Sequence, residues 1–406
     1  MRLLCLTSRL PYPPNRGDRL RAFHFLRRLS EEHELHLISF IAREEEREHV
    51  PFLQKYCRSV TVVQQSPTRS ALTVAGNLWR RDPLQVLYYR SRPMQRLVDQ
   101  TLAGAAFDAA YVHMFRMSPY VAHAADLYRI VDLTDVVSQE VQRSLAYRRA
   151  LWQLIYRVEG RRIAYYERHV AQRFEETWLI SEADRRALAA VCPDANIRVV
   201  PNGVDLQRLR PLEVRPDPRR MLFVGHLDVF HNVDAATFLA REVLPRVLSR
   251  YPDAVLELVG AGGSAAIQPL AALPGVTLTG YVEDLNGALN RAALFVAPLR
   301  FAAGVQNKVL EAMAAGRPVV TSSVANAGLG AEPGTHLLVA DGAAATAEQI
   351  LQLLENPHLA RRLGAAGREF VARRFSWDRV NERMAAIASL IANGHGDDSG
   401  QGVGNA

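Results

Sequence analysis

The chain has 406 residues, of which 49% are hydrophobic and 22% charged, and it contains 25 glycines and 21 prolines. This composition excludes a disordered, collagen-like or low-complexity protein, because apolar residues are abundant and neither glycine nor proline is enriched. At roughly 100–200 residues per domain, the length favours two or three domains, each able to bury its own core. No apolar run approaches the roughly 18–20 residues that span a bilayer.

The cysteines and the start of the chain bear on its cellular compartment. Three widely spaced cysteines (Cys5, Cys57 and Cys192) provide neither a disulfide framework nor a CxxC metal site. The segment Met1–Leu6 is too short and too charged for a signal peptide, and it is typical of a first buried strand. We therefore expect a cytoplasmic protein.

The net charge of +7 comes entirely from the first half of the chain. Residues 1–205 hold 30 Arg and Lys against 23 Asp and Glu, whereas residues 206–406 hold 19 of each sign. Two interpretations remain open: a solvated, arginine-rich surface, or a surface that meets phosphates, nucleic acid or lipid.

The arginines are densest in residues 142–174, where eight of them accompany only two acidic residues, Glu159 and Glu167. Aromatic side chains are interspersed among them: Trp152, Tyr156, Tyr165 and Tyr166. One interpretation is a helix that lies on an anionic membrane, near a lipid-linked acceptor. The other is a solvated helix that covers the first domain. Because no RNA-binding motif accompanies the charge, we expect no nucleic-acid partner.

Apolar segments separated by helical spacing predict two successive α/β halves. A strand (Leu3–Thr7), a loop, a helix (Leu20–Leu29) and a second strand (Leu35–Phe40) occupy the first forty residues. Such a series is a βαβ unit, which implies a parallel sheet. Further strands of this half are expected at residues 109–112, 129–132, 177–180 and 197–200.

After a proline-bearing linker that ends near residue 220, the alternation restarts with the strand Met221–Gly225. Later strands are expected at 255–260, 276–280, 294–298, 318–321 and 337–339, and helices at 233–247, 308–315, 347–354, 358–374 and 377–392. We expect a first domain of residues 1–205 and a second of 206–375, then a helix (376–392) that packs back on the first domain and a disordered tail (393–406). Since open parallel sheets bind ligands at the carboxyl ends of their strands, a cleft is expected between the domains.

The stretch from Ala297 to Val320 carries the clearest chemistry. It predicts a strand, a turn that contains Gly304, and a helix whose free N–H groups and positive dipole end attract anions. Lys308, in the first turn of that helix, is placed to reach a diphosphate. Glu311 lies on the same helix face and can accept hydrogen bonds from vicinal hydroxyls such as those of ribose. The pattern indicates a sugar-nucleotide site; an ordinary surface Lys/Glu pair is the alternative.

This stretch resembles the donor-binding segment of retaining glycosyltransferases with the GT-B fold, of the broad family four. Other blocks are similar to that family and occur in its order: residues 11–17, 179–184, 199–205, 222–225, 258–262 and 276–281. The resemblance covers nearly the whole chain, to about Leu390. It implies an α/β, GT-B protein with two Rossmann-like domains whose parallel sheets face an interdomain cleft. Residues 14–21 and 304–308 are further similar to sugar transferases encoded beside exosortase/PEP-CTERM exopolysaccharide systems.

The resemblance also implies roles for individual residues. Gly17 would lie in the loop that faces the donor phosphates, and Glu311 would hold the nucleotide ribose. Gly304 and Val305 would offer backbone N–H groups to the transferred sugar or its phosphate. His113, at the end of a first-domain strand, would face the acceptor and the sugar.

Three positions depart from the family pattern. Ala303 stands where a glutamate usually grips the transferred sugar, so Gln306 or Asn307 is expected to take part in sugar recognition. After Gly225, His226 and His231 replace an arginine and a lysine that clamp the diphosphate, and histidines are weaker clamps at neutral pH. Lys308, with Arg16 or Arg19, is expected to supply the missing positive charge, and we take His113 and Lys308 as the candidate catalytic residues.

The sequence contains no Asp-x-Asp at a strand end and no histidine cluster, so we expect no metal and no cofactor apart from the nucleotide-sugar substrate. The predicted function is retaining transfer of a sugar to a glycan or lipid-linked acceptor in exopolysaccharide biosynthesis, in the cytoplasm or on the inner face of the plasma membrane. One alternative is a catalytically weak, sugar-nucleotide-binding subunit of a polysaccharide assembly complex. A dinucleotide oxidoreductase, suggested by Gly260–Gly263, is disfavoured because that run does not open a complete fingerprint.

Overall fold

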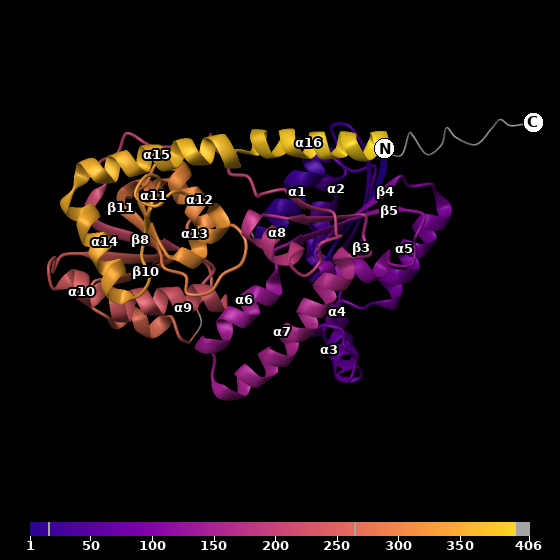
Figure 1. Cartoon of the computed structure of the whole chain (residues 1–406), viewed down its shortest axis with the longest axis horizontal. Helices are drawn as coiled ribbons and strands as arrows, with labels where there is room; N and C mark the ends of the chain where they lie inside the picture. Colours follow the sequence, from indigo (N-terminus) through magenta and orange to yellow (C-terminus); the bar gives the residue numbers. More distant parts are fainter. Residues whose placement is uncertain (15–16, 264, 395–406) are drawn as a thin grey trace, which may run out of the picture. The chain divides into compact units, whose positions relative to one another are not determined.

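The computed structural model describes residues 1–14, 17–263 and 265–394, and in it the chain forms two compact units (Figure 1). Unit 1 comprises residues 1–142, 149–200 and those from 381 onward; unit 2 comprises residues 143–148 and 201–380. Helix α16 (Trp377–Gly394) ends the described chain. Of the predicted disordered tail, residues 395–406 lie outside the described residues.

Unit 1 is built on a parallel sheet with the strand order β3-β2-β1-β4-β5-β6-β7 among its described residues. The strands are β1 (Arg2–Thr7), β2 (Glu34–Ile41), β3 (Ser59–Gln64), β4 (Ala109–His113), β5 (Tyr128–Thr134), β6 (Glu176–Leu179) and β7 (Ile197–Val199). β3 is the one strand of this sheet that the sequence analysis does not predict. It is an edge strand with half-buried side chains, and it lacks the continuous burial of the central strands.

Helices connect these strands. They are α1 (Gly17–Leu29), α2 (Val50–Leu53), α3 (Pro67–Ala75), α4 (Leu84–Tyr88), α5 (Arg92–Gly104), α6 (Val137–Ser144), α7 (Ala150–Ala171) and α8 (Glu182–Ala189). Short 3₁₀ turns cover Glu44–His49, Phe115–Tyr120 and Leu145–Tyr147. The strands are mostly buried on both faces, which explains their nearly continuous apolar sequences.

Unit 2 repeats the plan with the order β10-β9-β8-β11-β12-β13 in the part of the chain that is described. Its strands are β8 (Asp217–Val224), β9 (Val255–Val259), β10 (Val276–Gly280), β11 (Ala292–Ala297), β12 (Val319–Thr321) and β13 (Leu338–Val339). All of them pair in parallel. The predicted α/β class with two Rossmann-like parallel sheets is therefore confirmed.

The helices of unit 2 are α9 (Phe230–Phe238), α10 (Leu244–Leu248), α11 (Leu285–Arg291), α12 (Asn307–Ala314), α13 (Ser323–Leu329), α14 (Ala343–Glu355) and α15 (Pro357–Phe375), with a 3₁₀ turn at Gln268–Ala272. The single helix predicted over 233–247 is interrupted by a π-helical turn, Leu239–Val243, between α9 and α10. Pro245 lies just beyond this turn. Because proline has no N–H, the regular i→i−4 ladder cannot continue through it, and the widened turn absorbs the mismatch.

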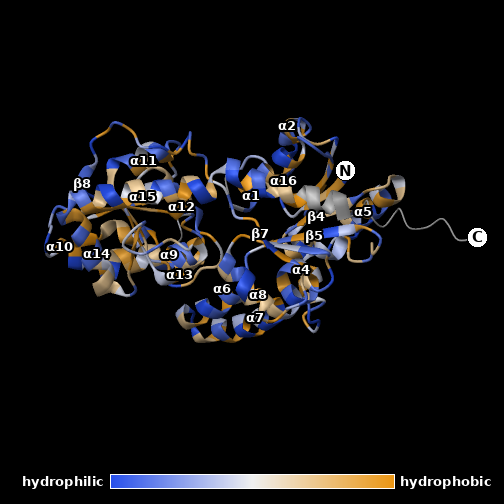
Figure 2. Cartoon of the chain, turned by 45° about the horizontal axis from the view of Figure 1, so that its top comes forward, coloured by the Kyte–Doolittle hydropathy of each residue, from blue (hydrophilic) through white to orange (hydrophobic). Residues whose placement is uncertain are grey.

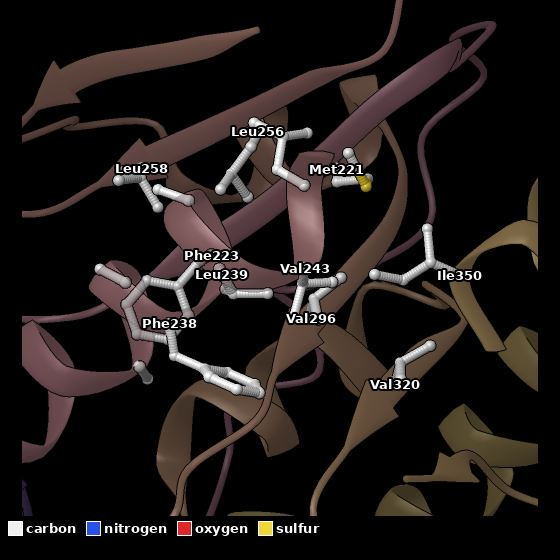
Figure 3. Close-up of a cluster of buried hydrophobic side chains, with 14 of the residues drawn as sticks. Met221, Phe223, Phe238, Leu239, Val243, Leu256, Leu258, Val296, Val320 and Ile350 are labelled. Atoms are coloured by element: carbon white, nitrogen blue, oxygen red, sulfur yellow. The ribbon is translucent and has the colours of Figure 1, made fainter. Parts of the chain in front are cut away.

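The core of unit 2 lies between its sheet and the helices α9, α10 and α14. Figure 3 shows side chains from β8, β9 and β11 meeting those of the π turn and α14, among them Phe223, Leu258, Val296, Leu239 and Ile350. All five are buried. Burial of each such side chain contributes about 1.5–3 kcal/mol to the free energy of folding. This packing holds in place the strand ends that carry the candidate site.

Candidate functional site

The turn between β11 and α12 is held by backbone contacts that require glycine at two positions. Gly304 has a φ of 62°, in the left-handed region. Its carbonyl oxygen packs against α13, where a Cβ added to Gly328 would lie only 1.8 Å from it. No side chain caps the start of α12 in the described structure. The N–H groups of this first turn lie at the positive end of the helix dipole, and no side chain of the described protein accepts a hydrogen bond from them as a cap.

Lys308 joins the start of α12 to the end of β8. Its Nζ donates a hydrogen bond to Asn232 Oδ1, and Asn232 Nδ2 donates to the carbonyl of His226 at 3.1 Å. Asn232 is buried, and a Cβ on Gly225 would lie 2.8 Å from its Cγ. The predicted residues Gly225, His226 and Lys308 are thus brought together, with a lysine ammonium at the carboxyl end of the first strand of the unit.

Glu311 lies one turn further along α12 and is half-buried. Burial raises the pKa of its carboxyl to about 7, against the lowering effect of Arg208 and Lys308. Among the residues that the structure describes, none donates a hydrogen bond to this carboxylate. It is therefore an acceptor beside two cations, able to take hydrogen bonds from hydroxyl groups of a ligand.

Gln306 and Asn307 each form a side-chain hydrogen bond within unit 2. Gln306 Nε2 donates to the Ala303 carbonyl at 2.9 Å, and Asn307 Oδ1 accepts from Asn202 Nδ2 at 3.1 Å. Ala303, Val305 and Gln306 are all buried. These contacts stabilise the turn, and the predicted contribution of Gln306 and Asn307 to sugar recognition stays a prediction.

The two histidines at the usual cation positions lie near the same strand end. His226 directly follows Gly225, and its Nδ1 is 3.9 Å from Asp228 Oδ2. His231, on α9, is half-buried and directly precedes the asparagine that holds Lys308. Through Asn232, Lys308 brings a fixed positive charge to the same strand end.

Unit 1 contains a buried ion pair at the carboxyl end of β5. Arg21 and Asp132 are both fully buried; Arg21 Nε donates to Asp132 Oδ2 at 2.7 Å and Nη1 to the Val200 carbonyl at 2.8 Å. Tyr111 Oη donates to the same Asp132 oxygen at 2.6 Å. Burial alone would raise the pKa of Asp132, but Arg21 and His113 outweigh it and hold this pKa well below its usual value.

His113 ends β4 and is 3% exposed. Its Nδ1 lies 3.5 Å from Asp132 Oδ2, and both ring nitrogens are buried without a hydrogen-bond partner among the described residues. The next residue, Met114, has a φ of 71°, and Thr134 at the end of the paired strand β5 has a φ of 70°. Such left-handed non-glycine residues cost about 1–3 kcal/mol each and gather at functional sites. The structure therefore places His113 at the strained carboxyl end of a central strand, with both ring nitrogens buried and unpaired among the described residues.

Gly17 begins α1, and cations surround the residue that follows it. Arg9 Nη1 lies 2.8 Å from Asp18 Oδ2. Burial would raise the pKa of Asp18, but Arg9, Arg116 and His113 lower it overall. Arg19, one of the two predicted phosphate-binding arginines, is paired with Glu46. The other, Arg16, lies outside the described residues.

Three residues that hold these sites together were not predicted from the sequence. Asp132 ends a predicted strand, which is a usable signal for the carboxyl edge of the sheet. Arg21 lies in a predicted helix with no role of its own, and Asn232 has no signal beyond its place after His231. Their partners come from distant parts of the chain, and periodicity does not specify such pairs.

The described part of the chain has neither a candidate metal cluster nor a candidate membrane span. No group of three or more His, Cys, Asp or Glu side chains there could hold a metal ion. Of the helices described, none is long and apolar enough to cross a membrane. Independence from metal stays a prediction.

Residues 218–356 match a family model described as glycosyl transferases group 1. The matched segment runs from β8 to α14 and contains every candidate residue of unit 2 from Gly225 to Glu311. The match therefore falls on the domain in which the sequence places the donor site.

Curated relatives match parts or most of the chain. A GDP-mannose-dependent monoacylated alpha-(1-6)-phosphatidylinositol monomannoside mannosyltransferase of Corynebacterium glutamicum is 26% identical over 231 residues, which are 52% of this chain and 61% of that protein. A phosphatidyl-myo-inositol mannosyltransferase of Mycobacterium tuberculosis is 31% identical over 208 residues, covering 48% and 54%. The chain thus spans little more than half the length of these relatives. An uncharacterized 44.6 kDa protein in the cps region of Klebsiella pneumoniae is 23% identical over 375 residues, covering 87% and 91%.

Solved structures share the whole architecture. A sucrose-phosphate synthase from Thermosynechococcus elongatus has a TM-score of 0.71 at 18% identity and covers 97% of this chain and 100% of its own. Anabaena HepE in complex with UDP and glucose has a TM-score of 0.66 at 15% identity, covering 96% and 100%. These likenesses concern the fold alone. The chain therefore has the GT-B fold, and its residues 218–356 match the family model of glycosyl transferases group 1.

Proposed function

We propose that the chain is a glycosyltransferase that moves a sugar from a nucleotide-sugar donor to a glycan or lipid-linked acceptor. One observation carries the proposal: Lys308 and Glu311, on one turn of α12, lie beside the end of β8 inside the segment that matches the family. The ammonium and the helix start suit a diphosphate, and the carboxylate suits the two hydroxyls of a ribose.

The proposed chemistry follows from the charges. When the glycosyl–phosphate bond breaks, negative charge builds on the leaving diphosphate, and Lys308 with the start of α12 stabilises it. The backbone of Gly304 and Val305 is placed at the same helix start, where it can orient the transferred sugar. In unit 1, His113 is the proposed group for the acceptor side, which the family resemblance implies and which its two buried, unpaired ring nitrogens at the end of β4 support.

The finer parts of the proposal rest on the family resemblance and on the names of relatives. We propose retention of anomeric configuration, metal independence, and a role in exopolysaccharide synthesis on the cytoplasmic side of the membrane, within the exosortase/PEP-CTERM-associated group. The curated mannosyltransferases are named for lipid acceptors, which supports a lipid-linked acceptor here.

The decisive experiment uses the full chain with a panel of UDP-, GDP- and ADP-sugars. Thermal shift first identifies the nucleotide that stabilises the protein selectively. Hydrolysis or transfer from the matching sugar donor is then measured with and without EDTA. We expect selective stabilisation and chelator-resistant turnover; stabilisation by no nucleotide would refute the proposed donor site, and loss of turnover with EDTA would refute metal independence.

A second candidate is a sugar-nucleotide-binding subunit with weak catalysis. The observation that favours it is Ala303, because a buried methyl group occupies the position of the family's sugar-binding carboxylate. Tight nucleotide binding without measurable turnover in the same panel would select this alternative. The dinucleotide oxidoreductase that the sequence disfavours is tested in parallel by measuring NAD(P)H binding, which we expect to be absent.

A further inference from the structure

Most of the exposed large apolar side chains in the described structure lie in two segments of unit 1. The first segment, residues 69–81, contains α3 and carries Leu72, Leu78 and Trp79, which are 73%, 51% and 79% exposed. The second, residues 149–165, is the first part of α7. We refer to the two segments together as the α3–α7 surface.

Helix α7 buries the apolar side chains of Ile163, Val170 and Ala171 against unit 1, and in its first half it carries a second apolar stripe that faces outward. Leu151, Leu154 and Val158, spaced three or four residues apart, point outward and are 71%, 60% and 47% exposed. Glu159 and Glu167 are buried against the unit. A helix that faces only water buries its apolar stripe and exposes its carboxylates. The outward stripe exceeds what this helix needs for packing on unit 1, which indicates that a partner covers it.

The two segments form one continuous surface. Arg162, on α7, donates a hydrogen bond from Nη2 to the carbonyl of Leu78, and Glu159 Oε1 accepts from the Leu84 N–H at 2.7 Å. Both overall views show α7 running alongside α4, the helix that follows the first segment, and Figure 2 marks its apolar residues in orange. The outward apolar side chains of α7 and the loop around Trp79 thus belong to the same side of unit 1.

The charge on this surface is mainly positive. Arg149, Arg157 and Arg161 are exposed, and the only acidic residue between positions 149 and 165 is the buried Glu159. The first segment adds Arg69, Arg80 and Arg81, of which Arg80 pairs at 2.7 Å with Asp82, the residue that follows the segment. A partner that covers this surface is therefore both apolar and anionic. The interface of an anionic lipid bilayer has these two properties, and tryptophan is favoured at its headgroup level.

We propose that the α3–α7 surface docks the protein on anionic lipid bilayers, with Trp79, Trp152 and the outward face of α7 in the headgroup region and the arginines on the lipid phosphates. The proposal extends the proposed function by locating the lipid-facing side of unit 1. Its test measures vesicle binding and no sugar transfer, so the failure of either proposal is distinguishable from failure of the other.

The first measurement uses the full chain and two kinds of vesicle: phosphatidylcholine alone, and phosphatidylcholine with phosphatidylglycerol in equal parts. Of the four tryptophans, Trp79 and Trp152 are the exposed ones, so insertion shifts the intrinsic emission to the blue. We expect binding to the anionic vesicles that weakens with salt, and little binding to the neutral ones.

Two double variants then separate the apolar and the charged parts by co-sedimentation. Trp79→Ser with Trp152→Ser is expected to weaken binding at least tenfold. Arg157→Gln with Arg161→Gln is expected to weaken binding to anionic vesicles about tenfold and to flatten its salt dependence. Matched controls remove an exposed valine elsewhere on unit 1, Val191→Ser, or two exposed arginines of unit 2, Arg241→Gln with Arg246→Gln, and should bind as wild type.

Three outcomes would overturn the proposal. The first is that the wild-type protein fails to bind the anionic vesicles. The second is that the tryptophan variant, shown to be folded by circular dichroism, binds as tightly as wild type. The third is concentration-dependent self-association of the wild type that the tryptophan variant abolishes without any change in vesicle binding. That result would assign the surface to a second copy of the chain.

Discussion

Replacement of Glu311 by glutamine tests the electrostatics of the candidate donor site. In the native protein, burial raises the pKa of the Glu311 carboxyl from 4.5 to about 7 despite Arg208 and Lys308. Between these two pH values the native state holds a proton that the unfolded chain has released. The stabilising contribution of the protonated carboxyl is therefore complete below about pH 4.5 and is lost as the pH rises through about 7.

The size of the effect follows from the shift. Each pKa unit corresponds to about 1.4 kcal/mol, so the ionised carboxylate costs at most about 3 kcal/mol above neutral pH. Glutamine is neutral at every pH and avoids this cost. We expect the Glu311→Gln variant to match wild type near pH 5 and to unfold several degrees higher near pH 8, at roughly 2–4 °C per kcal/mol.

The assay is thermal unfolding across this pH range, with Glu348→Gln, an exposed carboxylate on α14, as the control that leaves the pH dependence unchanged. Nucleotide titration of the same proteins adds a second readout. If Glu311 holds ribose hydroxyls as a carboxylate, wild-type affinity rises with pH through about 7, and the variant binds about tenfold or more weakly. A stability difference that is constant with pH would refute the electrostatic reasoning, and unchanged nucleotide affinity would remove Glu311 from the site.

Three more predictions follow from the described contacts. Lys308→Met should weaken nucleoside diphosphate binding about tenfold or more by calorimetry, while Lys55→Met, at the only other lysine, should not change it. Arg21→Met should lower the free energy of unfolding by about 3–5 kcal/mol because it leaves Asp132 buried and unpaired, and adding Asp132→Asn should restore part of that loss in denaturant melts. Gly328→Ala should displace the Gly304 turn, since its Cβ would lie 1.8 Å from the Gly304 carbonyl oxygen, and so reduce donor binding in the same titration with little change in the fold seen by circular dichroism.

Nearly all strands of both units and the helices α1, α7, α12, α14, α15 and α16 were predictable because their signals are local, whereas α2 to α6, α11 and α13 were not predicted. Buried parallel strands such as Leu3–Thr7 and Met221–Gly225 show as short apolar runs, and helices such as 308–315 show as 3.6-residue periodicity. The edge strand β3 and the π turn at Leu239–Val243 were not predicted. The first has no continuous apolar run, and the second depends on how the backbone absorbs one proline within a helix.

Only those residues of the candidate site that share one helix could be predicted together from the sequence. Lys308 and Glu311 share a helix turn, so their spacing sufficed to propose them together. The partner of Lys308 is Asn232, from a helix 76 residues earlier in the chain, and no local pattern specifies that contact. The same holds for Arg21 and Asp132, which are 111 residues apart.

The Arg21–Asp132 pair keeps a negative charge beside His113. A carboxylate that is wholly buried stays ionised only beside a fixed cation. Arg21 supplies that cation from α1, Tyr111 adds a hydrogen bond from β4, and Asp132 Oδ2 then lies 3.5 Å from Nδ1 of His113. Because both ring nitrogens are buried without a hydrogen-bond partner among the described residues, the carboxylate acts on the imidazole through its charge. A helix arginine to which the sequence pattern gives no role is therefore the group that maintains the charge beside the candidate catalytic histidine.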